Sequence, residues 1–170
     1  MLILGIDPGL RITGYGLVSL SRGQPSLREA GVLRIKAKGD MASRLLELHT
    51  TLTALIAETR PDHVAVEQLY AHYKHPRTAI LMGHARGAIL LAAAQHDIPV
   101  TNLASTMVKR TVTGNGHAGK PQVQRTVAML CKLAKPPEPP DVADAIAIAW
   151  TLATRMRAGA TLPKGLAIKE

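Results

Sequence analysis

The sequence predicts one α/β domain, with a mixed five-stranded sheet flanked by helices, and two observations carry that prediction. The first is size, because 170 residues of which 46% are hydrophobic suffice for one buried core but not for two ordinary domains. The second is the order of the elements, in which three strand-like segments precede alternating helices and strands. We expect residues 1–157 to form the domain and residues 158–170 to form a flexible tail.

The first three strands are predicted close together. An apolar run over residues 2–6 stops at Asp7-Pro8-Gly9, which indicates a buried strand that ends in a turn. Residues 13–20 and 27–35 predict the second and third strands, and the turn-forming residues 21–25 separate them. Three strands joined by short turns favour an antiparallel meander.

Helices and two more strands are predicted in the rest of the chain. Asp40 stands where an N-cap is expected, before apolar residues at helical spacing over residues 41–58. Residues 78–95 are strongly apolar, so we expect a long, largely buried helix there that could pack against another subunit. The other predicted elements are strands over 63–67 and 98–103 and helices over 105–112, 121–133 and 141–157. This order matches the ribonuclease H-like fold, although order alone does not establish a fold.

The charge balance favours an anionic partner. Lys and Arg total 21 against 12 Asp and Glu, a net charge of +9 that suits nucleic acid or an acidic membrane surface, unless it only keeps the surface soluble. No apolar stretch reaches the roughly 18 residues of a membrane span, and no secretory leader is visible. The single Cys131 cannot form an internal disulfide, and we expect a buried thiol in a reducing compartment. These features predict a cytoplasmic protein without a membrane partner.

Four carboxylates occupy places where they would meet. Asp7 ends the first predicted strand and Glu67 ends the fourth, while Asp141 and Asp144 open the last helix and share a face at positions i and i+3. Their mutual repulsion would raise their pKa values, and two divalent cations such as Mg²⁺ would relieve it. Two such ions roughly 4 Å apart form the usual clamp for phosphodiester hydrolysis. Singly, Asp7 could be a turn residue, Asp141 an N-cap and Asp144 a favourable charge at a helix start. Glu67 is harder to explain in this way, because it follows an apolar run where a charge without a partner is costly.

An aromatic residue and several cations surround these acids in the sequence. Tyr70 follows Glu67 in a predicted loop, where its ring could stack on an unpaired base or cover the edge of the core. Lys74 and Arg77 flank the same loop, as phosphate contacts or as solvated charges.

Two further lysines stand on either side of a glycine-rich loop. Lys109 lies on a short predicted helix and Lys120 begins the next one. Either lysine could offset charge at a reacting phosphate or be an ordinary surface residue. We favour a catalytic role for Lys120, because the loop before it could close over DNA. The seven histidines follow no zinc-ligand spacing, so we do not expect zinc.

Several ordered motifs resemble those of the RuvC Holliday-junction resolvase family. The motifs are LGIDPGLRITGYG at 4–16, VEQLY at 66–70, GHARG at 83–87, VKRTVTG and KPQVQ at 108–114 and 120–124, and DVADAIAIA at 141–149. The first motif alone is shared with actin-like kinases, whereas the ordered set is specific. Tyr70 stands where many relatives carry Phe, and the loop from Tyr73 to Arg77 is more basic than is typical of the family.

The resemblance implies a homodimeric endonuclease that binds four-way DNA junctions and nicks two strands of like polarity with Mg²⁺ or Mn²⁺, two ions per site. It also implies a branch-migration motor as a partner. The family's acidic positions fall on Asp7, Glu67, Asp141 and Asp144. Its aromatic falls on Tyr70, and its cleft lysines fall on Lys109 and Lys120.

Three other functions compete with this one. A non-catalytic junction-binding protein on the same fold would have no need of four repelling acids. An actin-like kinase or ATPase needs two such domains, for which 170 residues are too few. A YqgF-type nuclease of the same fold is a nearer rival, but the GHARG motif and the Asp141–Asp144 pair favour RuvC.

Overall fold

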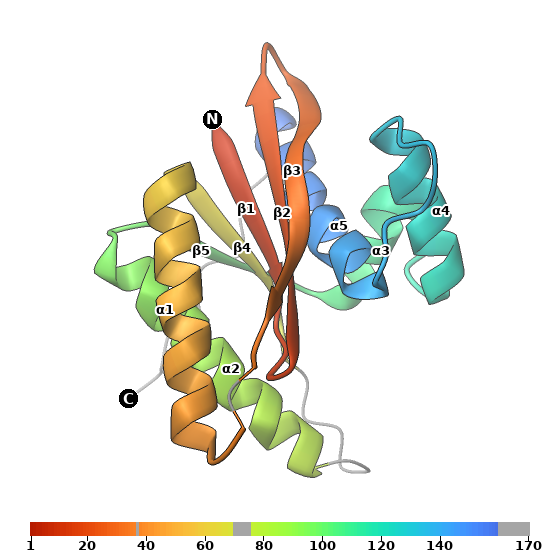
Figure 1. Cartoon of the computed structure of the whole chain (residues 1–170). Coiled ribbons are helices and arrows are strands. Elements are labelled where there is room, and N and C mark those ends of the chain that lie inside the picture. Colours follow the sequence, from red (N-terminus) through yellow and green to blue (C-terminus); the bar gives the residue numbers. More distant parts are fainter. Residues whose placement is uncertain (37, 70–75, 160–170) are drawn as a thin grey trace, which may run out of the picture.

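The architecture is a five-stranded sheet with helices on both faces, as seen in the computed structural model (Figure 1). The structure describes residues 1–36, 38–69 and 76–159. The strands are β1 (Leu2–Asp7), β2 (Ile12–Ser21), β3 (Gln24–Arg34), β4 (His63–Glu67) and β5 (Val100–Leu103). They lie in the order β3-β2-β1-β4-β5, with β1, β2 and β3 antiparallel and with β4 and β5 parallel to β1. The predicted mixed sheet and its antiparallel meander are therefore confirmed.

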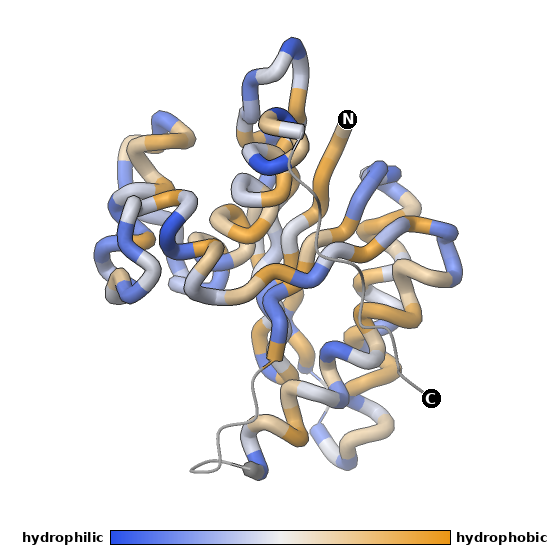
Figure 2. Tube along the Cα trace, turned by 180° about the vertical axis from the view of Figure 1, so that it is seen from behind, coloured by the Kyte–Doolittle hydropathy of each residue, from blue (hydrophilic) through white to orange (hydrophobic). Residues whose placement is uncertain are grey.

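Strand β1 is the centre of the sheet and is buried on both faces. Leu4 and Ile6 point into the core below α1 and α2, whereas Ile3 points into the core below α5. A strand covered on both sides needs apolar residues without alternation, and Figure 2 shows the segment that starts at the N-terminus in the orange of hydrophobic residues. Asp7 follows this run as the last residue of the strand and stands opposite Gly14 of β2.

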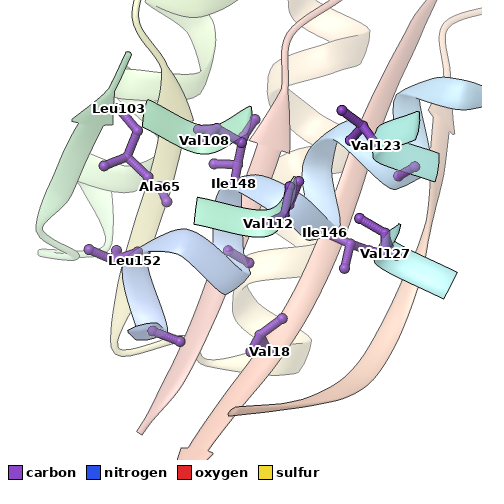
Figure 3. Packing of buried hydrophobic residues seen from close by; sticks show 14 of the residues in the cluster. Val18, Ala65, Leu103, Val108, Val112, Val123, Val127, Ile146, Ile148 and Leu152 are labelled. Carbon is purple, nitrogen blue, oxygen red and sulfur yellow. The ribbon is translucent and has the colours of Figure 1, made fainter. Parts of the chain in front are cut away.

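The helices divide between the two faces. Helices α1 (Met41–Thr59) and α2 (Pro76–Gln95) cover one face, and α3 (Ser105–Thr113), α4 (Lys120–Leu130) and α5 (Pro140–Arg157) cover the other. Figure 3 shows the core on the face covered by α3, α4 and α5, where side chains of these helices meet Val18, Ala65 and Leu103 of the sheet. Asp40 caps α1 as predicted, accepting a hydrogen bond from the Ser43 backbone N–H at 2.9 Å.

Glycines allow α5 to lie directly on β1 and β2. A Cβ atom at Gly5 would lie 2.3 Å from the carbonyl oxygen of Ala145, and one at Gly14 would lie 2.1 Å from that of Asp141. Real side chains do not tolerate such contacts, so only glycine permits this approach of helix to strand. The first turn of α5 is thereby fixed beside the end of β1.

Helix α2 differs from its prediction. Ala85, Ile89, Ala92 and Ala93 are buried, but a second side of the helix is exposed, with Ile80 and Leu91 60% and 53% accessible. The prediction of a largely buried helix is therefore wrong for the single chain. The apolar residues of α2 are distributed around the whole helix, and the sheet and α1 cover only one side of it.

Smaller differences concern element ends. Helix α4 stops at Leu130 rather than residue 133, because Lys132 adopts a left-handed conformation with φ of 54°. Cys131 is half-buried rather than buried, and burial raises the pKa of its thiol to about 11. Within the described ranges, no helix combines the length and the apolar character needed to cross a bilayer. Residues 160–170 of the expected tail lie outside those ranges, and the domain boundary at 157 stays a prediction.

Candidate active site

The four predicted acids lie at one edge of the sheet. Asp7 is the last residue of β1, and Glu67 is the last residue of the neighbouring parallel strand β4. Asp141 and Asp144 lie in the first turns of α5, which the contact at Gly14 holds against the end of the same strands. The carboxyl ends of two parallel strands and the N-terminus of a helix thus point toward one place.

Asp7 is at the electrostatic centre of this group. Its pKa is raised from 3.8 to about 8, first by burial and then by the negative charges of Asp144, Glu67 and Asp141, while Lys120 opposes the shift. Asp7 therefore lies within electrostatic range of the other three acids, and we call these four residues the acid cluster.

Two of the other acids are held by neighbouring donors. Burial and the charge of Asp144 raise the pKa of Glu67, against a hydrogen bond from the Ser105 side chain and the charges of Lys109 and Lys120. Burial also raises the pKa of Asp144, which Lys120 opposes most strongly. The Nζ atom of Lys120 lies 3.6 Å from Oδ2 of Asp144. The two lysines therefore compensate only part of the negative charge.

The donor set suits a hard divalent cation, although it does not form a finished cage. Among the described residues, no three His, Cys, Asp or Glu side chains stand close enough together to hold an ion without moving. The donors are all carboxylate oxygens, the ligands that Mg²⁺ and Mn²⁺ prefer. Burial first, and the charges of neighbouring acids second, disfavour the ionised forms of Asp7 and Asp144, and a divalent cation would offset both costs, so the residues present fit such an ion.

Arg86 is a site residue that the sequence did not single out. Its guanidinium donates a hydrogen bond to the backbone carbonyl of Glu67 at 2.7 Å and another to the side chain of Asn102. Asn102 is buried on β5, and burial lowers the pKa of Arg86. Arg86 therefore fastens the ends of β4 and β5 to α2. The GHARG motif contained this residue but gave no indication of its partners.

Other residues that position the acids carried weaker signals. Gly5 and Gly14 stood in the first motif as part of a resemblance, without a packing role. Ser105 was expected only as a helix start. Its contact with Glu67 depends on how α3 packs under the sheet, which the sequence does not display.

The predicted basic residues fall in different surroundings. Lys109 is half-buried on α3 and Lys120 is exposed at the start of α4, and both face the acids. Arg77 is exposed in the first turn of α2. Tyr70 and Lys74 lie outside the described residues, as does most of the basic loop from Tyr73 to Arg77.

The glycine-rich loop before Lys120 is ordered by hydrogen bonds among its own residues and by one buried side chain, while its closure over DNA stays a prediction. The Asn115 backbone N–H donates to the Thr113 hydroxyl at 3.1 Å, and the His117 backbone N–H donates to the Asn115 side chain at 2.9 Å. Ala118 is buried in the core below α5. We therefore expect Lys120 to act from a fixed helix start.

Comparison with known proteins gives one family over most of the chain. The family model described as crossover junction endodeoxyribonuclease RuvC matches residues 3–152. The chain is 51% identical over 146 residues to a protein of that description from Rhodopirellula baltica, covering 86% of this chain and 82% of the relative. It is 43% identical over 157 residues to another from Thermosipho melanesiensis, covering 92% and 99%.

Solved structures give the same result. The fold resembles that of Thermus thermophilus RuvC with a TM-score of 0.85 and 32% identity, covering 96% of this chain and 99% of the other. A structure of T. thermophilus RuvC in complex with Holliday junction substrate gives a TM-score of 0.86 at the same identity and coverage. The yeast mitochondrial resolvase Ydc2, with a TM-score of 0.62 and 14% identity, shares the fold. The glycine-seated acid cluster, the family model and these relatives together show that the chain belongs to the crossover junction endodeoxyribonuclease RuvC family.

Proposed function

We propose that this protein is a metal-dependent endodeoxyribonuclease that resolves four-way DNA junctions by paired, symmetric nicking during recombination and repair. The observation that carries the proposal is the convergence of four carboxylates and two lysines at one sheet edge, in a chain similar to a RuvC solved with Holliday junction substrate. A protein that only bound junctions would gain nothing from acids that repel both DNA and one another. The family match leaves the YqgF-type alternative without support.

Asp7, Glu67, Asp141 and Asp144 would hold two Mg²⁺ or Mn²⁺ ions. When bound, such ions supply an activated water and stabilise the leaving oxygen of the phosphodiester. The chain itself sets the positions of the acids, through the glycine contacts of α5 and through Arg86 behind Glu67.

Lys120 is the proposed catalytic cation. Its Nζ atom lies 3.6 Å from Oδ2 of Asp144, which supports the proposal that it would offset charge developing on the leaving oxygen of a phosphate bound at the acid cluster. Lys109 is more buried than Lys120, and its charge lowers the pKa values of Glu67 and Asp144. We therefore propose that it binds the same DNA strand as Lys120.

Further DNA contacts are proposed at the start of α2. Arg77 is exposed there, beside the loop that carries Tyr70 and Lys74 in the sequence. We propose that Tyr70 stacks on a base at the junction crossover and that Lys74 and Arg77 contact phosphates. Arg77→Ala should reduce the slope of log affinity against log salt by roughly 0.9. An unchanged slope would make Arg77 an ordinary surface residue.

We propose that the uncovered face of α2 forms a homodimer. Ile80 and Leu91 are exposed on it, and Gly83 and Gly87 project toward the same side with open space around their α-carbons. Apolar side chains bracketing two glycines allow a second helix to approach closely. A two-fold dimer would present one active site to each of two strands, as paired nicking requires.

The dimer is tested by placing charge on that face. Ile80→Glu with Leu91→Glu should convert a dimer into a monomer in light scattering and should replace paired nicks by single ones. Leu46→Glu is the matched control, because Leu46 is 67% exposed on α1 and outside this face. A dimer that survives the double substitution would place the interface elsewhere. We further propose a cytoplasmic location and, from the family resemblance, contact with a branch-migration motor.

The main test is a cleavage assay on end-labelled four-way junctions and matched linear duplex, with Mg²⁺, Mn²⁺ or EDTA. We expect symmetric nicks on the junction alone, none in EDTA and none with Asp7→Asn. Tight junction binding without cleavage under any metal would support a non-catalytic binder instead.

A further inference from the structure

A hollow of about 470 Å³ adjoins the acid cluster on the α1 and α2 side of the sheet. Its walls come from the turn between β1 and β2, the first turn of α1 and the first turns of α2, and Asp141 stands on its rim. The turn is closed by the Thr13 hydroxyl, which donates to the Gly9 carbonyl at 2.7 Å. The volume lies within the roughly 300–1,000 Å³ of pockets that hold small ligands.

The lining combines an apolar surface with cations. Met41, Leu81 and Met82 supply apolar wall, while Arg11 and Arg44 add two guanidinium groups, one exposed and one half-buried. Asp141, shared with the acid cluster, is the single carboxylate of this lining. Apolar wall suits the face of a base, and a guanidinium binds phosphate with paired hydrogen bonds.

We infer that this hollow binds a nucleotide of the cleaved strand next to the scissile phosphate, with its base against the methionines and its phosphate against Arg11 and Arg44. The inference rests on the proposed function. Its support is continuity, because a strand held at Asp141 reaches the hollow without leaving the protein surface. The proposed dimer face uses other residues of α2, since neither Ile80 nor Leu91 lines the hollow.

The base contact is tested by a double-substitution cycle on binding, measured in EDTA so that no strand is cut. Junctions carry an abasic site at each of the three positions on either side of the cut. One position should weaken binding to the wild-type protein by roughly tenfold. Met82→Gln keeps the side-chain volume but removes its apolar character, and in this variant the same abasic site should cost less than twofold.

Controls separate the hollow from general damage. Leu46→Gln, on an exposed part of α1, should leave the abasic effect intact. Met41→Gln gives a second route to the same result if Met82→Gln does not fold. If the abasic site weakens binding by the same factor in both methionine variants as in the wild-type protein, the base contact is overturned. That result would favour an acidic peptide as the occupant.

The phosphate contact has its own readout. Arg44→Gln should lower the log–log salt slope of junction binding by roughly 0.9, whereas Arg28→Gln, exposed on β3, should leave it unchanged. An unaltered slope for Arg44→Gln would overturn this part of the inference. If wild-type protein neither binds nor cuts junctions, the proposed function itself fails. If it cuts them but shows no coupling, only the hollow is excluded.

Discussion

Replacing Asp7 by Asn should stabilise the metal-free protein while abolishing cleavage. Burial and three neighbouring acids raise the pKa of Asp7 from 3.8 to about 8, so the folded state holds a proton that the unfolded state releases. The contribution of Asp7 to the stability of the folded protein therefore falls as the pH rises from about 4 and is lowest above pH 8. Asparagine keeps the shape of the side chain and removes this penalty.

The size of the effect follows from the shift. A pKa change from 3.8 to about 8 corresponds to about 5–6 kcal/mol at 1.36 kcal/mol for each pH unit. Water screens the cluster and its charges are coupled, so we expect about 2 kcal/mol at pH 9, or a rise in Tm of about 4–8 °C. The gain should be smaller at pH 5, where wild-type Asp7 is protonated in the folded state.

Thermal melts in EDTA at pH 5 and pH 9 measure this directly. Asp97→Asn is the matched control, because Asp97 is exposed and far from the cluster in the sequence. Adding Mg²⁺ should stabilise the wild type more than Asp7→Asn, and the variant should still bind junctions. A variant that is less stable than wild type at pH 9, or a gain that is equal at both pH values, would refute the electrostatic account of the site.

Three further substitutions test how the site is held. Gly14→Ala should cost about 3 kcal/mol in chemical denaturation, because its methyl group would meet helix backbone that cannot move aside; full stability would mean that α5 is not seated as described. Lys120→Gln should slow cleavage about 100-fold and shift its pH profile to higher pH, since Asp144 loses the cation that lowers its pKa; an unshifted profile would remove Lys120 from the site. Arg86→Lys should weaken Mn²⁺ binding about tenfold, both in the Mn²⁺ concentration for half-maximal cleavage and in calorimetry, while junction binding in EDTA stays unchanged. Equal Mn²⁺ affinity would show that the hydrogen bond from Arg86 to Glu67 does not matter.

The sequence predicted the acids because local signals fix their positions. Asp7 and Glu67 end apolar strands, and Asp141 and Asp144 open a helix behind prolines, so the sequence indicates where each acid lies in its element, while the glycine contacts of α5 bring the helix start to the same edge. The sheet and the capped helix α1 followed from periodicity and from Asp40 in the same way.

What the sequence did not predict depends on contacts between distant segments. Arg86 meets Glu67 and Asn102 only because α2 crosses beneath the ends of β4 and β5. The hollow beside Asp141 has walls from separated segments, none of which is distinctive alone. Helix α2 carries apolar residues all round, so its composition could not say which side the sheet would leave uncovered.

Because α5 rests directly on glycines, the relative positions of the acids do not depend on how well the side chains of the core pack. Where side chains space a helix from a sheet, every change of core volume moves the helix and whatever its first turn carries. Here backbone meets backbone at Gly5 and Gly14, so the distance between the strand-borne and the helix-borne acids is set by atoms common to every amino acid. We therefore expect changes of side-chain volume deeper in the core to lower stability without moving the four carboxylates relative to one another.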